Sequence, residues 1–254
     1  MEENRIYYFS ATGNSLYAAR AVGAALGGCT VVPMEPDGAL PEGMERIGIV
    51  FPVFWWGLPK RVIEFASSLN FSGNRDAYVF AVATCGGSRG GALPQLGSLL
   101  QKKGHSLDYS IVVPMVGNYV IEYNIPSSAD GKLQKAQAKL ETAAQDIAQK
   151  KKAKAPVGIP GSGLINSKFL AKVENLDGNF SVSGDCISCG TCSRVCPVEN
   201  IRMEDGKPTF LHHCENCLAC LHWCPQAAID YAGKTTNRGR YHHPSVSLAD
   251  ITRR

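Results

Sequence analysis

One motif occurs twice towards the end of this chain and restricts what that region can become. Residues 186–197 follow the pattern Cys-x2-Cys-x2-Cys-x3-Cys-Pro, and residues 214–225 repeat it. Eight of the ten cysteines lie in these two copies, and no basic and apolar leader opens the chain. Such clustering favours metal ligands over disulfide bonds. The candidate ligands are Cys186, Cys189, Cys192, Cys196, Cys214, Cys217, Cys220 and Cys224.

The spacing of the motif suits an iron–sulfur cube better than zinc. Three closely spaced thiolates can surround one corner of a [4Fe-4S] cluster, and the Cys-Pro turn carries the fourth cysteine away. Zinc also binds four cysteines, but its modules usually offer separated Cys-x2-Cys pairs. We therefore expect two [4Fe-4S] clusters in residues 181–232, which resemble the bacterial two-cluster ferredoxins. That resemblance implies that Cys196 and Cys224 each ligate the other motif's cluster, whereas sequence order alone would keep each motif separate.

A domain of about fifty residues buries too little apolar surface to fold alone, so iron–sulfur bonds must replace a core. Three histidines, His212, His213 and His222, lie close to the cysteines in sequence. We expect them to pack or form hydrogen bonds, because cysteines already supply every cluster position.

The first 155 residues alternate between strand-like and helix-like segments. Hydrophobic residues make up 44% and charged residues 19% of the chain, which excludes wholesale disorder. The alternation predicts an α/β fold, with a parallel sheet covered by helices on both faces. Strands are predicted at 6–9, 29–32, 47–51, 77–83 and 109–113, and helices at 15–26, 58–69, 93–103 and 129–154.

Composition divides the chain into four parts. Residues 1–155 form the α/β domain, 156–180 a linker that begins rich in Pro and Gly, 181–232 the cysteine domain, and 233–254 a tail. The tail holds five basic residues and one acid, and we expect it to lie on the surface. The longest apolar stretch, 47–59, is too short and too broken to span a bilayer. We expect a cytoplasmic protein without a membrane or nucleic-acid partner. The net charge of +4 argues neither for nor against nucleic acid, but the basic residues of the tail are not interleaved with aromatic ones.

The loop after the first predicted strand is a candidate anion site. It reads Ser10-Ala11-Thr12-Gly13-Asn14-Ser15 and leads into a helix. Short polar side chains and glycine leave backbone N–H groups free to surround a phosphate at a helix N-terminus. A plain helix cap would explain the same residues. No P-loop lysine and no Gly-x-Gly-x-x-Gly pattern follow, so neither a nucleoside triphosphate nor a dinucleotide is indicated.

Two more loops follow the third and fourth predicted strands, at the sheet edge where open α/β sheets bind ligands. One offers large aromatic faces, and the other offers glycine backbone that can approach a flat ring closely. Trp55 or Trp56 is expected to stack on such a ring, although either could instead fill a core. Gly117, Asn118 and Tyr119, after the fifth strand, could also reach the ring, although an ordinary exposed loop would explain them too. The two loops are Pro52-Val53-Phe54-Trp55-Trp56-Gly57 and Thr84-Cys85-Gly86-Gly87-Ser88, followed by Gly90.

Residues 5–150 resemble flavodoxin. The flavodoxin phosphate loop has the pattern Thr/Ser-x-Thr-Gly-x-Thr/Ser, matched here by Ser10, Thr12, Gly13 and Ser15. The resemblance implies a five-stranded parallel sheet of order 2-1-3-4-5 and bound FMN, with its ring between the two later loops. A single compact anion site also favours FMN over FAD.

The whole chain resembles the flavodoxin–ferredoxin fusion proteins of anaerobic bacteria and archaea. Such proteins often end in an Arg-x-Tyr-His-His-Pro-like tail, matched by residues 240–244. The resemblance implies FMN, two [4Fe-4S] clusters and a small α+β two-cluster ferredoxin-like domain after the flavodoxin-like one.

Two functions from different classes are compatible with these cofactors. In the first, the chain relays electrons between the clusters and FMN, and so links one-electron and two-electron partner proteins. In the second, it is an FMN-dependent reductase of a small organic substrate or NAD(P)H, with the clusters as an internal relay. The ring loops show no positioned acid–base pair and the chain has no NAD(P) fingerprint, which favours the electron carrier. The sequence indicates neither the redox partners nor the oligomeric state.

Overall fold

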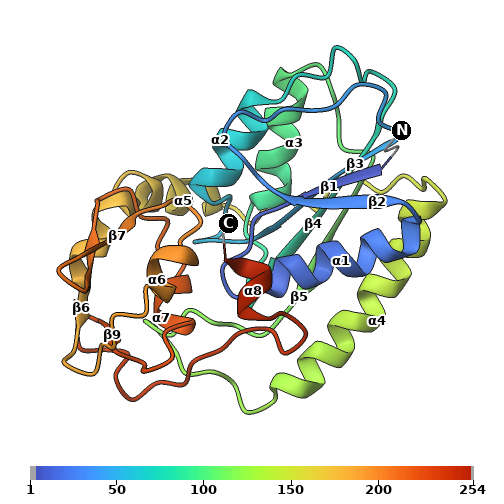
Figure 1. Cartoon of the computed structure of the whole chain (residues 1–254). Helices are drawn as coiled ribbons and strands as arrows, with labels where there is room; N and C mark the ends of the chain where they lie inside the picture. Colours follow the sequence, from blue (N-terminus) through green and yellow to red (C-terminus); the bar gives the residue numbers. More distant parts are fainter. Residues whose placement is uncertain (1–3, 253–254) are drawn as a thin grey trace.

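The computed structural model describes residues 4–252. Five strands form one parallel sheet in the order β2-β1-β3-β4-β5 (Figure 1). This order confirms the expected flavodoxin-like α/β fold. Every residue of β4 is buried, as the unbroken apolar sequence of an interior parallel strand requires. The strands are β1 (Asn4–Tyr8), β2 (Cys29–Pro33), β3 (Arg46–Pro52), β4 (Tyr78–Cys85) and β5 (Tyr109–Pro114).

Helices cover both faces of the sheet. On one face, α1 (Asn14–Leu26) and α4 (Ala129–Ala148) pack over Ile6 and Phe80. On the other, α2 (Lys60–Ser68) and α3 (Ala92–Lys102) pack over Phe51. Helix α4 ends six residues before the predicted position 154. The reason is a turn at Lys150, which has a φ of 51°, after which the N–H of Ala153 donates to the carbonyl of Asp108 at 2.9 Å.

The cysteine domain is small and contains two short antiparallel sheets. Its core is completed by the other domain, because Val120 and Ile121, from the loop after β5, are buried among its cysteines. The two domains therefore pack against each other and are not connected by the chain alone. The elements are β6 (Phe180–Val182) paired with β9 (Ile229–Tyr231), β7 (Ile201–Glu204) paired with β8 (Lys207–Phe210), α6 (Thr191–Arg194) and α7 (Ala219–His222).

Residues 156–180, expected to be a linker, instead contain two helical elements. These are α5 (Ser162–Leu170) and the 3-10 helix η1 (Val173–Asn179). The buried Asn166 on α5 explains their position, because its Nδ2 atom donates to the carbonyls of Phe54 and Leu58 at 3.1 and 3.2 Å. Helix α5 is thereby fixed against the loop that follows β3.

The tail also differs from the surface segment that the sequence suggested. Tyr241, His243 and Val246 are buried, and α8 (Leu248–Ile251) lies beside the beginning of α1 (Figure 1). The tail therefore returns from the cysteine domain to the flavodoxin-like domain. No helix within residues 4–252 is long and apolar enough to cross a membrane.

Candidate functional site

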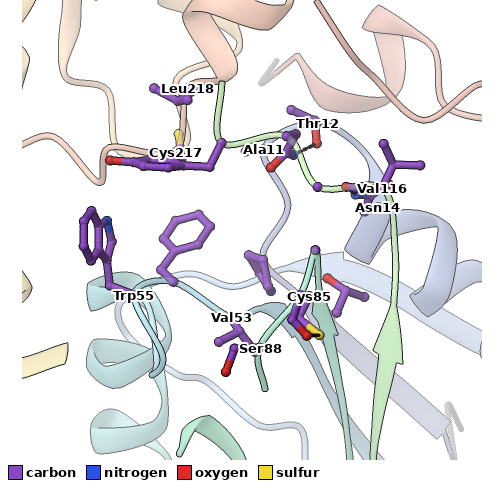
Figure 2. Close-up of a pocket in the computed structure, with 18 of the residues that line it drawn as sticks. Ala11, Thr12, Asn14, Val53, Trp55, Cys85, Ser88, Val116, Cys217 and Leu218 are labelled. Atoms are coloured by element: carbon purple, nitrogen blue, oxygen red, sulfur yellow. Dashed lines mark hydrogen bonds between the residues drawn. The ribbon is translucent and has the colours of Figure 1, made fainter. Parts of the chain in front are cut away.

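A cavity of about 480 Å³ opens at the carboxyl ends of the strands, between the two domains. Figure 2 shows Trp55 on one side of it, Val53, Ser88 and Cys85 below, and Thr12 on the side opposite Trp55. Seventeen of the twenty residues that the sequence suggested for cofactor binding line this main cavity. They are Ser10, Ala11, Thr12, Asn14, Ser15, Pro52, Val53, Phe54, Trp55, Trp56, Thr84, Cys85, Gly86, Gly87, Ser88, Asn118 and Tyr119.

The three remaining candidates, all glycines, shape the loops from outside the cavity lining. Gly13 precedes α1 with a φ of 94°, and a Cβ atom on Gly57 would lie 2.3 Å from the side chain of Asn166. Gly90 has a φ of 54°, and a Cβ atom there would lie 1.9 Å from the carbonyl oxygen of Trp56. A larger residue at any of these positions would displace a neighbouring segment.

Residues 10–15, called the phosphate loop below, lie at the N-terminus of α1. A helix N-terminus attracts anions, because its first N–H groups have no partner within the helix. The loop is well ordered by hydrogen bonds: Ser15 Oγ lies 2.9 Å from Thr84 Oγ1, and Asn118 Nδ2 donates to Thr12 Oγ1. The Asn14 amide donates to the carbonyl of Val116 at 3.1 Å, so this side chain ties the loop to the chain after β5.

The aromatic wall of the cavity is built on a strained turn. Phe54 and Gly57 exchange two backbone hydrogen bonds of 3.0 and 2.9 Å, and between them Trp55 and Trp56 have φ angles of 43° and 63°. Left-handed backbone costs a non-glycine residue about 1–2 kcal/mol. The turn places the Trp55 ring parallel to Phe169, at 5.5 Å and 19°, and edge-on to Tyr119 at 5.7 Å.

Gly117 also lines the cavity, and ten further lining residues were not assigned to it from the sequence, although Cys217 was expected as a cluster ligand. Those from the loop after β5 share its position at the carboxyl edge, so the same argument applied to a longer segment would have found them. Phe169 and the residues of the cysteine domain reach the cavity only through domain packing, which leaves no local signal. The ten are Val116, Glu122, Tyr123, Asn124, Pro126, Lys132, Phe169, Asn216, Cys217 and Leu218.

The eight motif cysteines fall into two sets of four, each around its own small cavity. Each set takes three cysteines from one motif and the fourth from the other, so the structure has the crossed grouping. Within residues 4–252, no three His, Cys, Asp or Glu side chains lie close enough together to hold a single metal ion. The first cysteine set is Cys186, Cys189, Cys192 and Cys224, and the second is Cys196, Cys214, Cys217 and Cys220.

The thiols of the two sets differ in their electrostatic surroundings. In the first set, a hydrogen bond with Thr191 lowers the pKa of the exposed Cys189 thiol, whereas burial raises the pKa of Cys192 to about 11. In the second set, burial raises the pKa of Cys214 to about 12 and also raises the pKa of Cys220. Four thiols around a shared space form the donor set of an iron–sulfur cluster, and a cluster in the second cavity would be the more shielded from water.

The second cysteine set lies directly behind the main cavity. Cys217 and Leu218 line both spaces, and Figure 2 shows them above the hollow. Hydrogen bonds cross the boundary on either side: Tyr119 Oη donates to Asn216 Oδ1 at 2.9 Å, and His222 Nε2 lies 2.8 Å from the carbonyl oxygen of Asn118. The loop after β5 and the segment of the second cysteine set are thus joined by hydrogen bonds.

A buried carboxylate adds a further tie near the second set. Glu215 follows Cys214 and accepts hydrogen bonds from the N–H groups of Lys60 and Arg61, at the beginning of α2. Burial raises the pKa of Glu215 to about 7. The neighbouring Arg61 donates to the carbonyl of Pro197, in the Cys-Pro turn, at 3.2 Å.

The residues present fit a flavin phosphate ester in the main cavity. One end offers a helix N-terminus with polar side chains, and the other offers flat aromatic walls. Between these two ends lie Gly86 and Gly87, which are exposed and have no side chains, so a flat ring could approach their backbone closely. A cavity of this volume is within the usual range for a small-molecule site.

Comparisons with known proteins agree with this arrangement. Residues 185–229 match the family of 4Fe-4S dicluster domains. A ferredoxin from Pyrobaculum islandicum is 36% identical over 53 residues, which are 20% of this chain and 50% of that protein. The chain thus matches half the length of that curated relative.

Solved structures with a similar first domain include three flavoproteins or redox enzymes. The flavodoxin of Megasphaera elsdenii has a TM-score of 0.35 and 18% identity, covering 53% of this chain and 98% of that one. Rubredoxin oxygen:oxidoreductase from Desulfovibrio gigas has a TM-score of 0.40 and 20% identity, covering 59% of this chain and 36% of that one. An FMN-dependent NADH-azoreductase from Bacillus anthracis in complex with FMN has a TM-score of 0.42 and 11% identity, covering 58% of this chain and 100% of that one.

The order of the sheet, rather than these overall scores, defines the fold of the first domain. The chain combines a flavodoxin-like domain with a ferredoxin-like iron–sulfur domain. Its second domain is therefore that of an iron–sulfur protein.

Proposed function

We propose that this chain is an electron carrier that holds two [4Fe-4S] clusters and one FMN. When bound, FMN exchanges electrons singly or in pairs, while each cluster exchanges one, so the protein would link one-electron and two-electron partner proteins. The first cysteine set would hold the cluster nearer the surface, and the second set the cluster nearer the flavin. The phosphate loop would bind the FMN phosphate, and the aromatic wall would hold the ring.

The observation that carries this proposal is the position of Cys217. This residue lines both the second cysteine cavity and the main cavity. A cluster thiolate at that position would separate iron from flavin by little more than one side chain. The neighbouring Leu218, 2% exposed, keeps water out of the same boundary.

The test is anaerobic reduction of the reconstituted protein by a low-potential one-electron donor, followed by flavin absorbance. Acid-released flavin should run as FMN rather than FAD on chromatography. Cys217→Ala should slow flavin reduction strongly, whereas Cys29→Ala, in the distant strand β2, should not. Equal flavin reduction rates in all three proteins would show that the flavin does not receive its electrons through the second set.

One observation favours the alternative, an FMN-dependent reductase of a small organic substrate or NAD(P)H. The main cavity is lined beyond the expected flavin contacts by Glu122, Asn124 and Lys132, and its two tryptophans are 42% and 40% exposed. Such charged and amide side chains could hold a polar substrate beside the flavin. Steady consumption of NADH or NADPH without a partner protein would favour this alternative over the carrier.

A further inference from the structure

The tail contains a motif that the proposed electron transfer does not use. Tyr241, in residues 240–244, donates from its hydroxyl to Asn14 Oδ1 at 2.7 Å. His243 donates its backbone N–H to the carbonyl oxygen of Thr12 at 2.8 Å. Tyr241 is 8% exposed and His243 is 2% exposed. The tail is therefore built into the outer side of the phosphate loop.

The cysteine domain holds the preceding carbonyl of the same loop. Trp223 Nε1 donates to the carbonyl oxygen of Ala11 at 3.0 Å. Two successive carbonyls of the loop, those of Ala11 and Thr12, are thus both held from outside the flavodoxin-like domain. The Trp223 ring is in turn stacked on His242 of the tail at 4.4 Å and 12°.

This pairing sets the direction of the backbone N–H groups. Because a peptide unit is planar and trans, the N–H that follows a carbonyl points the opposite way. The N–H groups of Thr12 and Gly13 therefore point away from Trp223 and His243, respectively. Gly13 N–H indeed reaches Ser10 Oγ, within the loop, at 3.2 Å. Successive N–H groups on one side of a turn form a concave anion site.

The tail also fixes the first residues of α1. Asn14 is held at both ends of its amide, since Nδ2 donates to Val116 and Oδ1 accepts from Tyr241. Val246 packs on Gly13 so closely that a Cβ atom on Gly13 would lie 2.9 Å from the Val246 Cβ. The helix N-terminus is thereby clamped between the chain after β5 and the tail.

Two further contacts hold the tail along α1. The His243 ring is stacked on Tyr17 at 4.0 Å and 20°. Asp250, at the start of α8, pairs with Arg20 at 2.6 Å. These contacts lie one and two turns into α1, so the tail follows the helix rather than touching it at one point.

We propose that residues 240–246, together with Trp223, form an outer support of the phosphate loop that sets the affinity for the phosphate group of the flavin. This inference rests on the proposed binding of FMN in the main cavity. Tyr241 is a positioning residue in it, because it acts through Asn14 and does not line the cavity. The support would act on the phosphate rather than on the ring, since its hydrogen bonds to the flavodoxin-like domain fall on Ala11, Thr12 and Asn14.

The test compares two flavins that differ only in the phosphate. Anaerobic fluorescence titrations give the dissociation constants of FMN and riboflavin for the wild-type chain, Tyr241→Phe and Tyr78→Phe. Tyr78→Phe is the matched control, because its buried hydroxyl also donates to a carbonyl, that of Lys151, at the opposite end of the sheet. Iron and sulfide contents confirm that each variant keeps its clusters.

We expect Tyr241→Phe to bind FMN about tenfold more weakly, the effect of one buried hydrogen bond, with riboflavin binding unchanged. Tyr78→Phe should bind both flavins as the wild type does. Unchanged FMN affinity in Tyr241→Phe, or an equal loss for both flavins, would overturn the inference while leaving the proposed function standing. A wild-type chain that binds neither flavin would overturn both.

Discussion

The two cysteine sets derive from the same repeated motif but lie in different surroundings. In the first set, Cys189 is exposed and the neighbouring Ile187 is 59% exposed. In the second set, Cys220 is buried and Cys217 reaches the wall of the main cavity. One repeat therefore produces one site that faces solvent and one that faces a second binding site.

This difference suggests that the two clusters would differ in access to partner proteins and in reduction potential. A partner protein can approach the first set without displacing any other part of the chain, whereas the flavodoxin-like domain covers the second. Residues Val120 and Ile121 of that domain are buried in the cysteine core. Burial disfavours added negative charge. We therefore expect the second cluster to have the lower reduction potential of the two.

The largest effect we expect is the loss of a whole cluster on substituting its fourth, crossed cysteine. Cys196→Ala should lose or convert the same cluster as Cys214→Ala, because both thiols line the second cavity. Cys186→Ala should affect the other cluster. Iron analysis should give about half the wild-type content where a cluster is lost, and EPR of the reduced protein should identify the survivor. A Cys196→Ala spectrum that matched Cys186→Ala instead would show that the two motifs act independently.

The next effect concerns flavin binding. Asn216, Cys217 and Leu218 line the main cavity, whereas no residue of the first cysteine set does. Cys214→Ala should therefore weaken FMN binding by about 10- to 100-fold, since a disordered cysteine loop removes one wall and the Tyr119–Asn216 hydrogen bond. Cys186→Ala should change FMN binding by less than about threefold. Equal losses in both variants, measured by anaerobic titration, would mean that the two sets support the cavity alike.

Much of the fold followed from the sequence, because its signals are local. The buried strands are continuous apolar runs, and the phosphate loop is a compact motif between a strand and a helix. The positions of Trp55 and of the glycine loop after β4 followed from the rule that ligands bind at the carboxyl edge of the sheet. These features depend on neighbouring residues, which a pattern can report.

The rest depends on contacts between distant segments. Helix α5 is nine residues long with an exposed Leu164, so its apolar spacing is weak, and Asn166 docks it through backbone carbonyls 108 and 112 positions away. The basic tail suggested a solvated segment. In the structure, Arg240 donates to the carbonyls of Thr235 and Ile229, so its charge is used inside the fold. No local pattern distinguishes such an arginine from a solvated one.

An effect of similar size on FMN binding, but without loss of a cluster, is expected within the phosphate loop. Thr12 is 2% exposed, and its hydroxyl accepts a hydrogen bond from Asn118. Thr12→Ala should weaken FMN binding by about 1.5–3 kcal/mol, the worth of a hydrogen bond to a charged oxygen, with both clusters intact. Thr142→Ala, on the exposed side of α4, is the control. Unchanged FMN affinity in Thr12→Ala would show that the loop acts only as a helix cap.

The smallest effect we expect is a pH dependence of the tail. Burial lowers the pKa of His243 to about 4, against about 6.5 in an unfolded chain. Between these two values the unfolded state binds more protons than the folded state, so stability falls as the pH is lowered through this window. At about pH 5.5 the loss from this one group should be about 1 kcal/mol relative to pH 7.

His243→Gln should reduce that loss, and His105→Gln, beside Phe71 on the α2 and α3 side of the sheet, should not. Anaerobic urea unfolding of each protein at pH 7 and at about pH 5.5 measures this loss of stability. Because His243 is stacked on α1 beside the phosphate loop, acid should release flavin before it changes the EPR signal of the first cluster. The first cysteine set shares no lining residue with the main cavity, and its one hydrogen bond from the tail among those described is that of Arg240 to the carbonyl of Ile229, away from His243. Simultaneous loss of both signals at mild acidity would show that the solvent-facing and flavin-facing regions open as one unit.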